Sequence, residues 1–372
     1  MAKPRRAGFE GLEDRTLSTF QTVSRSLHRW MGACLALLVI VIALTGVGLI
    51  WQTSVNRHLY PQGAIAFDGT PASAARVALA ADRAFGPDSI DQVTFGNEDF
   101  GLSEVLLRDQ STAFIAADGQ IVGVWPLNGR WDDWLVDLHH RLLAGTAGLY
   151  VVGFTGIAAL ISILTGCIAF WPSRSSWRKG GLPRSSTPQS LRRSHRNVGV
   201  LMALPIALIV LTGVALSFPQ TAKRAIAWTY ENSETYGETF GDGVDMASGR
   251  DQAAWPRAFL RAAAVFPGAT ITGAIWPTDQ SEIVILLRNP GDWTDTGSGQ
   301  VQITAADGYM DLRIDGRHLP GGERLWNMVS PLHTGAVRGL AYAILETIIG
   351  LSLVYLAGIG LMSFVRAGVR RK

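Results

Sequence analysis

The feature that most constrains this chain is a long, mainly apolar stretch that begins with a histidine and occurs twice. In residues 28–49 and in residues 195–216, a glycine follows the histidine by four positions and a Thr-Gly pair begins seventeen positions after it. Unrelated apolar helices share leucines and valines by chance, but they rarely share a histidine and a Thr-Gly pair in one register. The stretches that start at His28 and His195 therefore indicate a duplicated half.

A second pair of histidines follows the same duplication. His139 and His333 lie 194 residues apart, each just before a long apolar run, and the same offset relates Gly166 to Gly360. His140 is an alternative to His139, although it fits this offset one residue worse. Each half is thus expected to begin one apolar helix with a histidine, pass through a polar segment, and begin a second apolar helix with another histidine.

Four runs of the chain are long enough to cross a lipid bilayer as helices. They are nearly free of charge and comprise Met31–Ile50, Leu142–Phe170, Val198–Phe218 and Gly339–Val365. A helix of about 20 residues spans a hydrocarbon core roughly 30 Å thick. Helices of this length in soluble proteins alternate apolar with polar residues, which these runs do not. We therefore predict an α-helical membrane protein with a four-helix transmembrane bundle built from two tandem repeats.

The charges between these runs predict how the helices are oriented. Residues 172–196 carry seven basic side chains and no acidic one. Residues 52–137 instead carry five basic and twelve acidic side chains, and residues 219–332 carry nine and fourteen. Because basic loops stay in the cytoplasm, both termini are expected there and the two acidic segments outside. The net charge of +3 comes from this asymmetry between basic inner loops and acidic outer segments. It therefore does not indicate nucleic-acid binding, and the expected partner is the lipid bilayer.

The chain is accordingly expected to consist of alternating membrane and aqueous segments. In order, these are a cytoplasmic lead-in (1–27), a first span (28–51), a first extracytoplasmic module (52–138), a second span (139–171), a basic cytoplasmic loop (172–194), a third span (195–218), a second extracytoplasmic module (219–332), a fourth span (333–366) and a cytoplasmic tail (367–372). The first span is interpreted as a signal anchor, because no small-residue cleavage site follows it.

Each extracytoplasmic segment is predicted to be a small α+β module. In the first, a helix at Pro71–Phe85 precedes short strands at Gln92–Thr94, Glu104–Arg108, Ala113–Ala116 and Gln120–Val124. In the second, a helix at Ala254–Phe266 precedes strands near Thr270–Trp276, Glu282–Arg288, Gln300–Thr304 and Tyr309–Arg313. An Asp-Gly pair between the last two strands of each module predicts a hairpin turn.

The orientation places one pair of histidines near each face of the predicted bundle. His28 and His195 enter the membrane from the cytoplasm, and His139 and His333 enter it from outside. Imidazoles on facing helices of a bundle are typical axial ligands of haem. A zinc site fits less well, because the carboxylates or cysteines that usually complete four ligands are missing beside these histidines. Since the sequence has no Cys-x-x-Cys-His motif, we expect two non-covalent b-type haems.

Other residues near these histidines suit a haem. Gly32 and Gly199, one helical turn beyond the inner histidines, would let a flat macrocycle lie against the backbone. Arg141 and Arg338, near the outer pair, suit haem propionates, whereas most arginines near the inner pair are explained equally well by the basic cytoplasmic face. Glu346, the only charge inside a membrane run, is either a functional carboxylate, in proton coupling or haem tuning, or a structural hydrogen-bonding group.

These motifs resemble the PepSY-associated transmembrane-helix family, iron-regulated membrane proteins that include siderophore-iron reductases. The resemblance covers almost the whole chain and implies PepSY-like outer modules and a bacterial inner-membrane location. The residues that carry it are His28-Arg29-Trp30-x-Gly32 with Leu44-Thr45-Gly46, Leu138-His139 followed by Leu142-Leu143, Leu164-Thr165-Gly166, Trp171-Pro172, His195-x3-Gly199 with Leu211-Thr212-Gly213, and Pro331-Leu332-His333-x-Gly335.

The resemblance also implies a function, a dihaem b-type protein that reduces ferric siderophore iron to Fe(II) at the periplasmic face. No Rossmann fingerprint follows a predicted strand, so we expect a separate cytoplasmic or quinol electron donor. Two other classes stay open. One is a quinol- or thiol-linked transmembrane electron carrier with a protein partner. The other is a non-redox membrane protein whose PepSY-like modules bind peptides or regulate a protease, and this class would show no haem absorbance.

Overall fold

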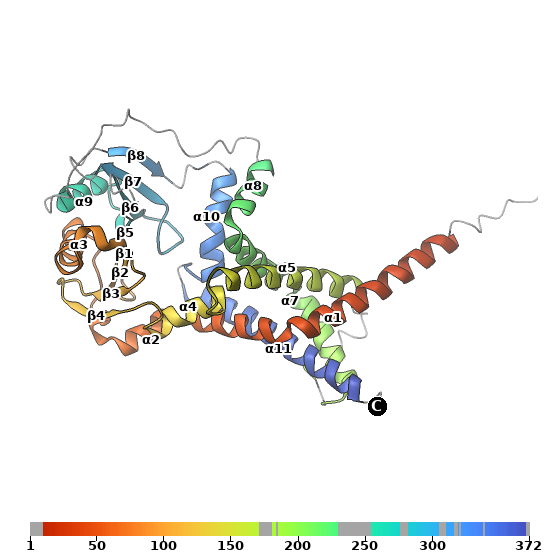
Figure 1. The fold of residues 1–372 in the computed structure, drawn as a ribbon. Helices are drawn as coiled ribbons and strands as arrows, with labels where there is room; N and C mark the ends of the chain where they lie inside the picture. The colour runs from red at the N-terminus through yellow and green to blue at the C-terminus, as the bar shows by residue number, and fades with distance from the viewer. Residues whose placement is uncertain are drawn as a thin grey trace, which may run out of the picture. The chain divides into compact units, whose positions relative to one another are not determined.

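The computed structural model describes residues 10–170, 181–183, 185–229, 254–275, 282–304, 310–315, 319, 321–337 and 339–369 (Figure 1). The chain divides into two compact units. The helical unit contains Met1–Gly48, Asp137–Pro219 and Ile344–Lys372, and the sheet unit contains Leu49–Val136 and Gln220–Ala343.

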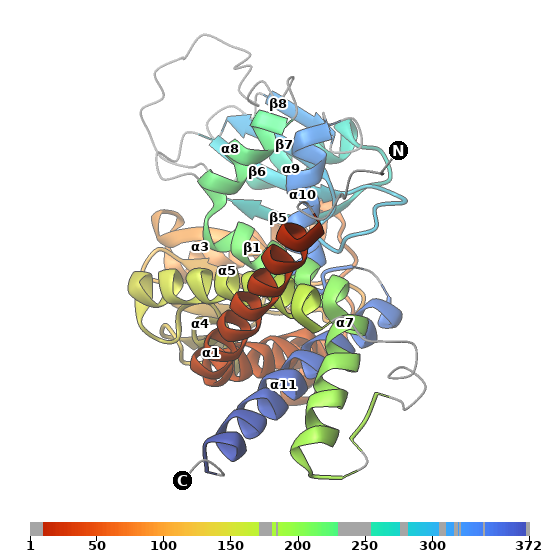
Figure 2. The ribbon, with the colours of Figure 1, turned by 90° about the vertical axis from the view of Figure 1, so that its right-hand side faces the viewer.

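The helical unit is built on four long helices. They are α1 (Glu10–Ile50), α5 (Gly145–Phe170), α7 (Pro188–Ser217) and α11 (Leu340–Val369), which Figure 2 shows from a second side. All four are long and apolar enough to cross a membrane, as the sequence predicts. The start of α7 has a local cause, because Thr187 Oγ1 accepts a hydrogen bond from the Ser190 N–H and Pro188 occupies the first turn.

The predicted second span, 139–171, is not a single helix. A short helix, α4 (Trp131–Arg141), ends just after His139, and α5 begins at Gly145. Leu142 and Leu143, which lie between the two helices, have φ angles of 51° and 58°. This left-handed conformation costs a residue with a side chain roughly 1–2 kcal/mol. The sequence gives no sign of the break, because leucines continue the apolar run through it.

The predicted fourth span, 333–366, is interrupted in the same way. His333 lies in the last turn of α10 (Gly321–Thr334), and α11 begins only at Leu340. Gly335 and Gly339, between the two helices, have φ angles of 73° and 115°, which glycine adopts without steric cost. His139 and His333 therefore each lie near the end of a short helix, and the prediction that they begin the membrane-spanning helices is wrong.

Two glycines allow the long helices to approach closely. A Cβ added to Gly156 of α5 would lie 2.6 Å from the side chain of Val214 of α7. A Cβ added to Gly350 of α11 would lie 2.5 Å from the side chain of Val47 of α1. Small residues at such crossings let helices pack backbone to backbone inside a membrane, where no hydrophobic force drives the helices together.

The sheet unit contains one antiparallel sheet of eight strands in the order β4-β3-β2-β1-β5-β6-β7-β8. Its strands are β1 (Ile90–Thr94), β2 (Ser103–Leu107), β3 (Thr112–Ile115), β4 (Ile121–Trp125), β5 (Thr270–Ile275), β6 (Glu282–Arg288), β7 (Gly299–Thr304) and β8 (Met310–Asp315). The remaining helices are α2 (Gln52–Leu59), α3 (Pro71–Phe85), α8 (Pro219–Thr229) and α9 (Ala254–Val265), with short 3-10 turns at Pro61–Ala64 and Pro87–Ser89.

The two predicted α+β modules share this sheet and are not separate. Strand β1 pairs with β5, with Val93 opposite Ala274 and Thr94 opposite Gly273. Unpaired, β1 and β5 would each expose a row of backbone donors and acceptors, and pairing them removes both edges. The predicted strands themselves agree with the structure to within two residues at each end.

The helices α3 and α9 cover one face of this sheet and pack against each other. Their contact contains Trp255 and Phe259, stacked with ring centroids 5.3 Å apart, and the indole N–H of Trp255 donates a hydrogen bond to Asp82. The side chains of Phe259 and Val93 are fully buried in the same core. One hydrophobic core therefore spans both modules and makes them a single folding unit.

A buried arginine connects the sheet to the start of α4. The guanidinium of Arg130 contacts Glu104 at 2.7 Å and both Asp132 and Asp133 at 2.9 Å, and it lies 4.1 Å from the ring centroid of Phe114. Arg130 itself is only 4 % exposed. Asp132 additionally accepts a hydrogen bond from the side chain of Asn56 on α2, and the side-chain oxygen Oδ1 of Asn56 accepts one from the Trp131 indole N–H. This network connects α2, β2 and α4.

Candidate functional site

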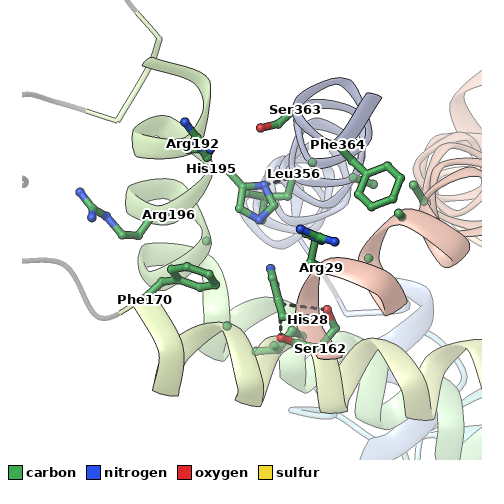
Figure 3. A pocket seen from close by; sticks show the side chains of 18 of the residues that line it. His28, Arg29, Ser162, Phe170, Arg192, His195, Arg196, Leu356, Ser363 and Phe364 are labelled. Carbon is green, nitrogen blue, oxygen red and sulfur yellow. Dashed lines mark hydrogen bonds between the residues drawn. The ribbon is translucent and has the colours of Figure 1, made fainter. Parts of the chain in front are cut away.

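The helical unit encloses a large cavity among its four long helices. Its volume is about 1190 Å³, and all of its lining residues come from α1, α5, α7 and α11. Figure 3 shows His28 of α1 and His195 of α7 on opposite sides of this cavity, each with a ring nitrogen directed toward the other. The structure therefore brings together the two histidines that the sequence assigns to the inner pair.

The two imidazoles are close to each other, and each is held by the backbone of another helix. Their ring centroids are 5.8 Å apart. Nδ1 of His28 lies 2.8 Å from the carbonyl oxygen of Ser162 on α5, and Nδ1 of His195 lies 3.1 Å from the carbonyl oxygen of Leu356 on α11. A carbonyl oxygen only accepts hydrogen bonds, so in both residues Nδ1 carries the proton.

This arrangement leaves Nε2 of each ring as an unprotonated lone-pair donor. Metal-bound histidines characteristically donate their other ring N–H to a backbone carbonyl, which fixes the tautomer and the ring orientation. At 5.8 Å between centroids, one metal atom can lie between the two rings. The inner pair therefore has the donor set and the second hydrogen bonds that two axial ligands of one haem need.

Arginines surround this pair. The cavity is lined by five of them and, among the described residues, by no aspartate or glutamate. Two are held over aromatic rings: Arg25 lies 5.8 Å from the centroid of Phe170, and Arg29 lies 5.3 Å from that of Trp30. Arg193 differs from both, because its Nε–H is buried and meets no acceptor among the described residues. A buried donor without an acceptor suits an anionic ligand group such as a carboxylate.

The walls of the cavity also fit a flat macrocycle. Gly32 and Gly199, predicted to leave room beside the inner histidines, both line the cavity. A Cβ added to Gly32 would meet no atom within 4 Å, so the open space begins at its backbone. No cluster of three or more His, Cys, Asp or Glu side chains suited to a metal ion occurs in the described part of the chain. Axial ligation of haem needs only two side chains, and the histidines, glycines and arginines of the cavity fit that group.

His139 is held in the same manner as the inner histidines. Its Nδ1 lies 2.9 Å from the carbonyl oxygen of Ile42 and 3.0 Å from Oγ1 of Thr45, both on α1. Its neighbour His140 is exposed. Arg141 is about half exposed and forms a 3.5 Å ion pair with Asp137, one turn earlier on α4.

The other predicted site residues are only partly described. His333 is half-buried near the end of α10. Arg338, predicted to hold a haem propionate, lies outside the described residues. Glu346 on α11 is 4 % exposed, so the one carboxylate predicted inside a membrane run is buried in the helical unit.

No role follows from the sequence for the residues that anchor the imidazoles. Ser162 and Leu356 supply the carbonyl oxygens, and Gly166 and Gly360, four residues further along the same helices, lie against the rings of His28 and His195. The signal was present in the offset of 194 residues that relates Gly166 to Gly360. It could not be interpreted without knowing which helices face each other.

Comparison with known proteins identifies one protein family. The sequence model of the family described as the PepSY-associated TM region matches residues 25–367, which include all of α5 and α7, most of α1 and α11, and the strands between them. Comparison with curated proteins gives no match.

Proposed function

The chain belongs to the family of proteins with a PepSY-associated transmembrane region, and from this premise we propose that it is a dihaem b-type reductase of the bacterial inner membrane. It passes electrons outward and reduces ferric siderophore iron to Fe(II). One haem is bound near the cytoplasmic face by His28 and His195. The second is bound near the periplasmic face by His139 and His333, as the sequence repeat predicts.

The observation that carries this proposal is the geometry of the inner pair. Two imidazoles from different helices face each other with centroids 5.8 Å apart, and both donate Nδ1–H to a helix carbonyl. A histidine that only filled space in a membrane helix would need neither the facing ring nor the second hydrogen bond. The lone pairs of both Nε2 atoms are thereby available at one point of the cavity.

The remaining residues of the cavity would bind and orient the group. Arg193 would donate its buried Nε–H to a propionate, and Arg25 and Arg29, held over aromatic rings, would contribute positive charge at the rim. Ala36 and Ile206, both buried, exclude water from the apolar wall. Two bound haems would supply one-electron transfer between the membrane faces, and Fe(II) is held more weakly than Fe(III) by the hard oxygen ligands of a siderophore.

Contacts inside the helical unit support two equivalent halves. Gly156 and Gly350 are 194 residues apart, and each receives a valine of another helix. Gly166 and Gly360 have the same offset, and each receives a histidine of another helix. In the proposed arrangement, α1 and α7 therefore play equivalent parts toward α5 and α11, and each haem site combines equivalent histidines from the two halves, His28 with His195 and His139 with His333.

The charge distribution supports the proposed direction. The segment 172–196 is basic, and the residues of the sheet unit carry an excess of acid, which the positive-inside rule assigns to the periplasm. A bulky ferric siderophore would be bound on that side, where the PepSY-like modules provide a folded surface. The electron donor would act at the arginine-rich cytoplasmic side.

A visible spectrum of the purified full-length protein tests the proposal. We expect low-spin b-type absorbance and, from pyridine haemochrome, two haems per chain. A ferric siderophore should reoxidise the dithionite-reduced protein, and a ferrous chelator should then trap Fe(II). Haem without siderophore-dependent oxidation would favour a quinol- or thiol-linked electron carrier, and a stoichiometry near zero would favour a peptide-binding or protease-regulating role.

Two variants test the exit point. His333→Ala should abolish reoxidation by the siderophore although the inner haem stays reducible. His28→Ala should still allow a chemically reduced outer haem to pass one electron to the ferric siderophore. If His333→Ala reduced the siderophore at the normal rate, the outer haem would not be the exit and the proposed direction would be wrong.

A further inference from the structure

Three histidines of the helical unit contact a glycine of a neighbouring helix in one common geometry. A Cβ added to Gly166 would lie 2.9 Å from Cε1 of His28, and one added to Gly46 would lie 2.9 Å from Cε1 of His139. One added to Gly360 would lie 3.4 Å from Cε1 of His195. In each case the imidazole covers the place where the side chain of any other residue would begin.

The hydrogen bonds follow the same rule. Each Nδ1 atom bonds to the carbonyl oxygen of the residue four positions before the contacted glycine, namely Ser162 before Gly166, Leu356 before Gly360 and Ile42 before Gly46. That carbonyl already accepts the N–H of the glycine within the helix. The imidazole N–H is therefore a further donor to an oxygen with two lone pairs.

The need for glycine follows from helix geometry. In an α-helix each Cα–Cβ bond tilts toward the N-terminus, so the Cβ of a residue lies over the turn that contains the carbonyl four positions earlier. Without a Cβ the lone pair of that carbonyl is uncovered on the helix surface. A flat imidazole can then lie on the glycine and reach the oxygen.

We propose that Gly46, Gly166 and Gly360 are positioning residues that expose one helix carbonyl each, and that this carbonyl holds the contacting histidine as its Nδ1–H tautomer with Nε2 free to bind a metal. The haem measurements below rest on the proposed function, but the tautomer itself does not. The three glycines thus determine ligand orientation although none of them would touch the iron.

A hydroxyl group adds a contact to Nδ1 at two of the three glycines. Thr45, just before Gly46, donates its hydroxyl proton to the carbonyls of Val41 and Ile42 at 2.9 Å, so its oxygen accepts from His139 Nδ1–H at 3.0 Å. Thr165, before Gly166, likewise bonds to the carbonyls of Ile161 and Ser162. At His28 it is Ser162 Oγ that lies 3.2 Å from Nδ1.

A graded series of glycine-to-alanine variants in the full-length protein tests the proposal. Gly358 is the matched control, because it lies on α11 two residues before Gly360 and a Cβ there would meet no atom within 4 Å. Gly166→Ala should have the largest effect on the inner haem and its histidine ligand, since the added Cβ would overlap His28. Gly360→Ala should have a smaller effect, and Gly358→Ala should have none.

The haem readout is affinity and the spectroscopic signature of the inner haem. Loss of a second hydrogen bond to a metal-bound histidine typically weakens metal binding about 10–100-fold, which is the range expected for Gly166→Ala. Electron paramagnetic resonance of the oxidised protein should show the inner low-spin signal altered in Gly166→Ala and Gly360→Ala. Gly46→Ala should alter only the outer signal.

Solid-state NMR of ¹⁵N-histidine-labelled protein in lipid provides the readout that needs no haem. With assignments from His28→Gln and His195→Gln, both histidines should show protonated Nδ1 in the parent protein, and Gly166→Ala should change His28 alone. An unchanged His28 tautomer together with unchanged haem affinity in Gly166→Ala would overturn the proposal, as would equal effects of Gly358→Ala and Gly360→Ala. If Gly166→Ala does not fold, the Gly358 and Gly360 pair decides. Absence of haem from the parent protein would overturn only the proposed function.

Discussion

The imidazole of His28 lies on the backbone of Gly166, with an added Cβ only 2.9 Å from ring atom Cε1. The two residues are 138 positions apart in the chain and belong to α1 and α5. Their contact brings His28, a proposed haem ligand, to the Ser162 carbonyl that sets its tautomer.

His28→Ala and His195→Ala should each remove the same haem, because the two rings face one cavity. Redox titration monitored in the visible region should show one component missing in either variant and the other preserved. His58→Ala is the control, since His58 is exposed on α2 and has no repeat partner. If the two variants lost different haems, the pairing of these histidines would be refuted.

Gly213→Ala is expected to perturb the outer haem and spare the inner one. Gly213 follows His195 by eighteen residues, as Gly46 follows His28. The preceding threonine, Thr212, bonds to the Ile209 carbonyl at 2.8 Å, which matches the bond from Thr45 to Ile42. Haem quantitation combined with electron paramagnetic resonance measures the effect, and a change confined to the inner signal would contradict the repeat.

Arg193→Gln should lower the midpoint potential of the inner haem, because removing a nearby positive charge favours the oxidised, more positive iron. For a partly buried charge close to the haem, we expect the midpoint potential to shift by roughly tens of millivolts. Arg192→Gln provides the control, since Arg192 lines the same cavity but is exposed to solvent screening. Equal shifts in the two variants would show that the buried Nε–H of Arg193 has no particular role.

Arg130→Met should destabilise the sheet unit by about 3 kcal/mol, because removing one partner of a buried ionic network leaves its carboxylates uncompensated. Arg130 holds Glu104, Asp132 and Asp133 while itself almost fully buried. Chemical denaturation followed by tryptophan fluorescence measures the change. Arg108→Met, which removes a more exposed 3.9 Å ion pair, should cost less than about 1 kcal/mol.

The same network should make stability fall as pH rises from about 4. Burial raises the pKa of the Glu104 and Asp133 carboxyls above their ordinary values of 4.5 and 3.8. The folded state then binds more protons than the unfolded state between the ordinary and the raised pKa, so the free energy of unfolding decreases through that window and levels off above it. Glu104→Gln should flatten this decrease in denaturation curves taken across the acidic range, and an unchanged slope would exclude Glu104 as a source.

Much of the local structure follows from the sequence, because it depends on neighbours in the chain. The helix predicted at Pro71–Phe85 is found with those bounds, where Thr70 caps its start and Gly86 follows its end. The four membrane helices follow from length and apolar content alone. The intervals from His28 to Thr45 and from His195 to Thr212 are equal, so the register of the candidate ligands could also be read without a structure.

The tertiary structure decided what each of these residues meets. Apolar periodicity cannot distinguish a helix face that contacts lipid from one that contacts another helix, so the contacts of Gly166 and Gly360 were invisible in the sequence. The end of α4 depends on the left-handed conformations of Leu142 and Leu143, which run against the local preference of residues with a side chain. Pairing of β1 with β5 is non-local. The sequence by itself determined which elements form and which histidines are in register, and only packing between distant segments decided which carbonyl orients each histidine.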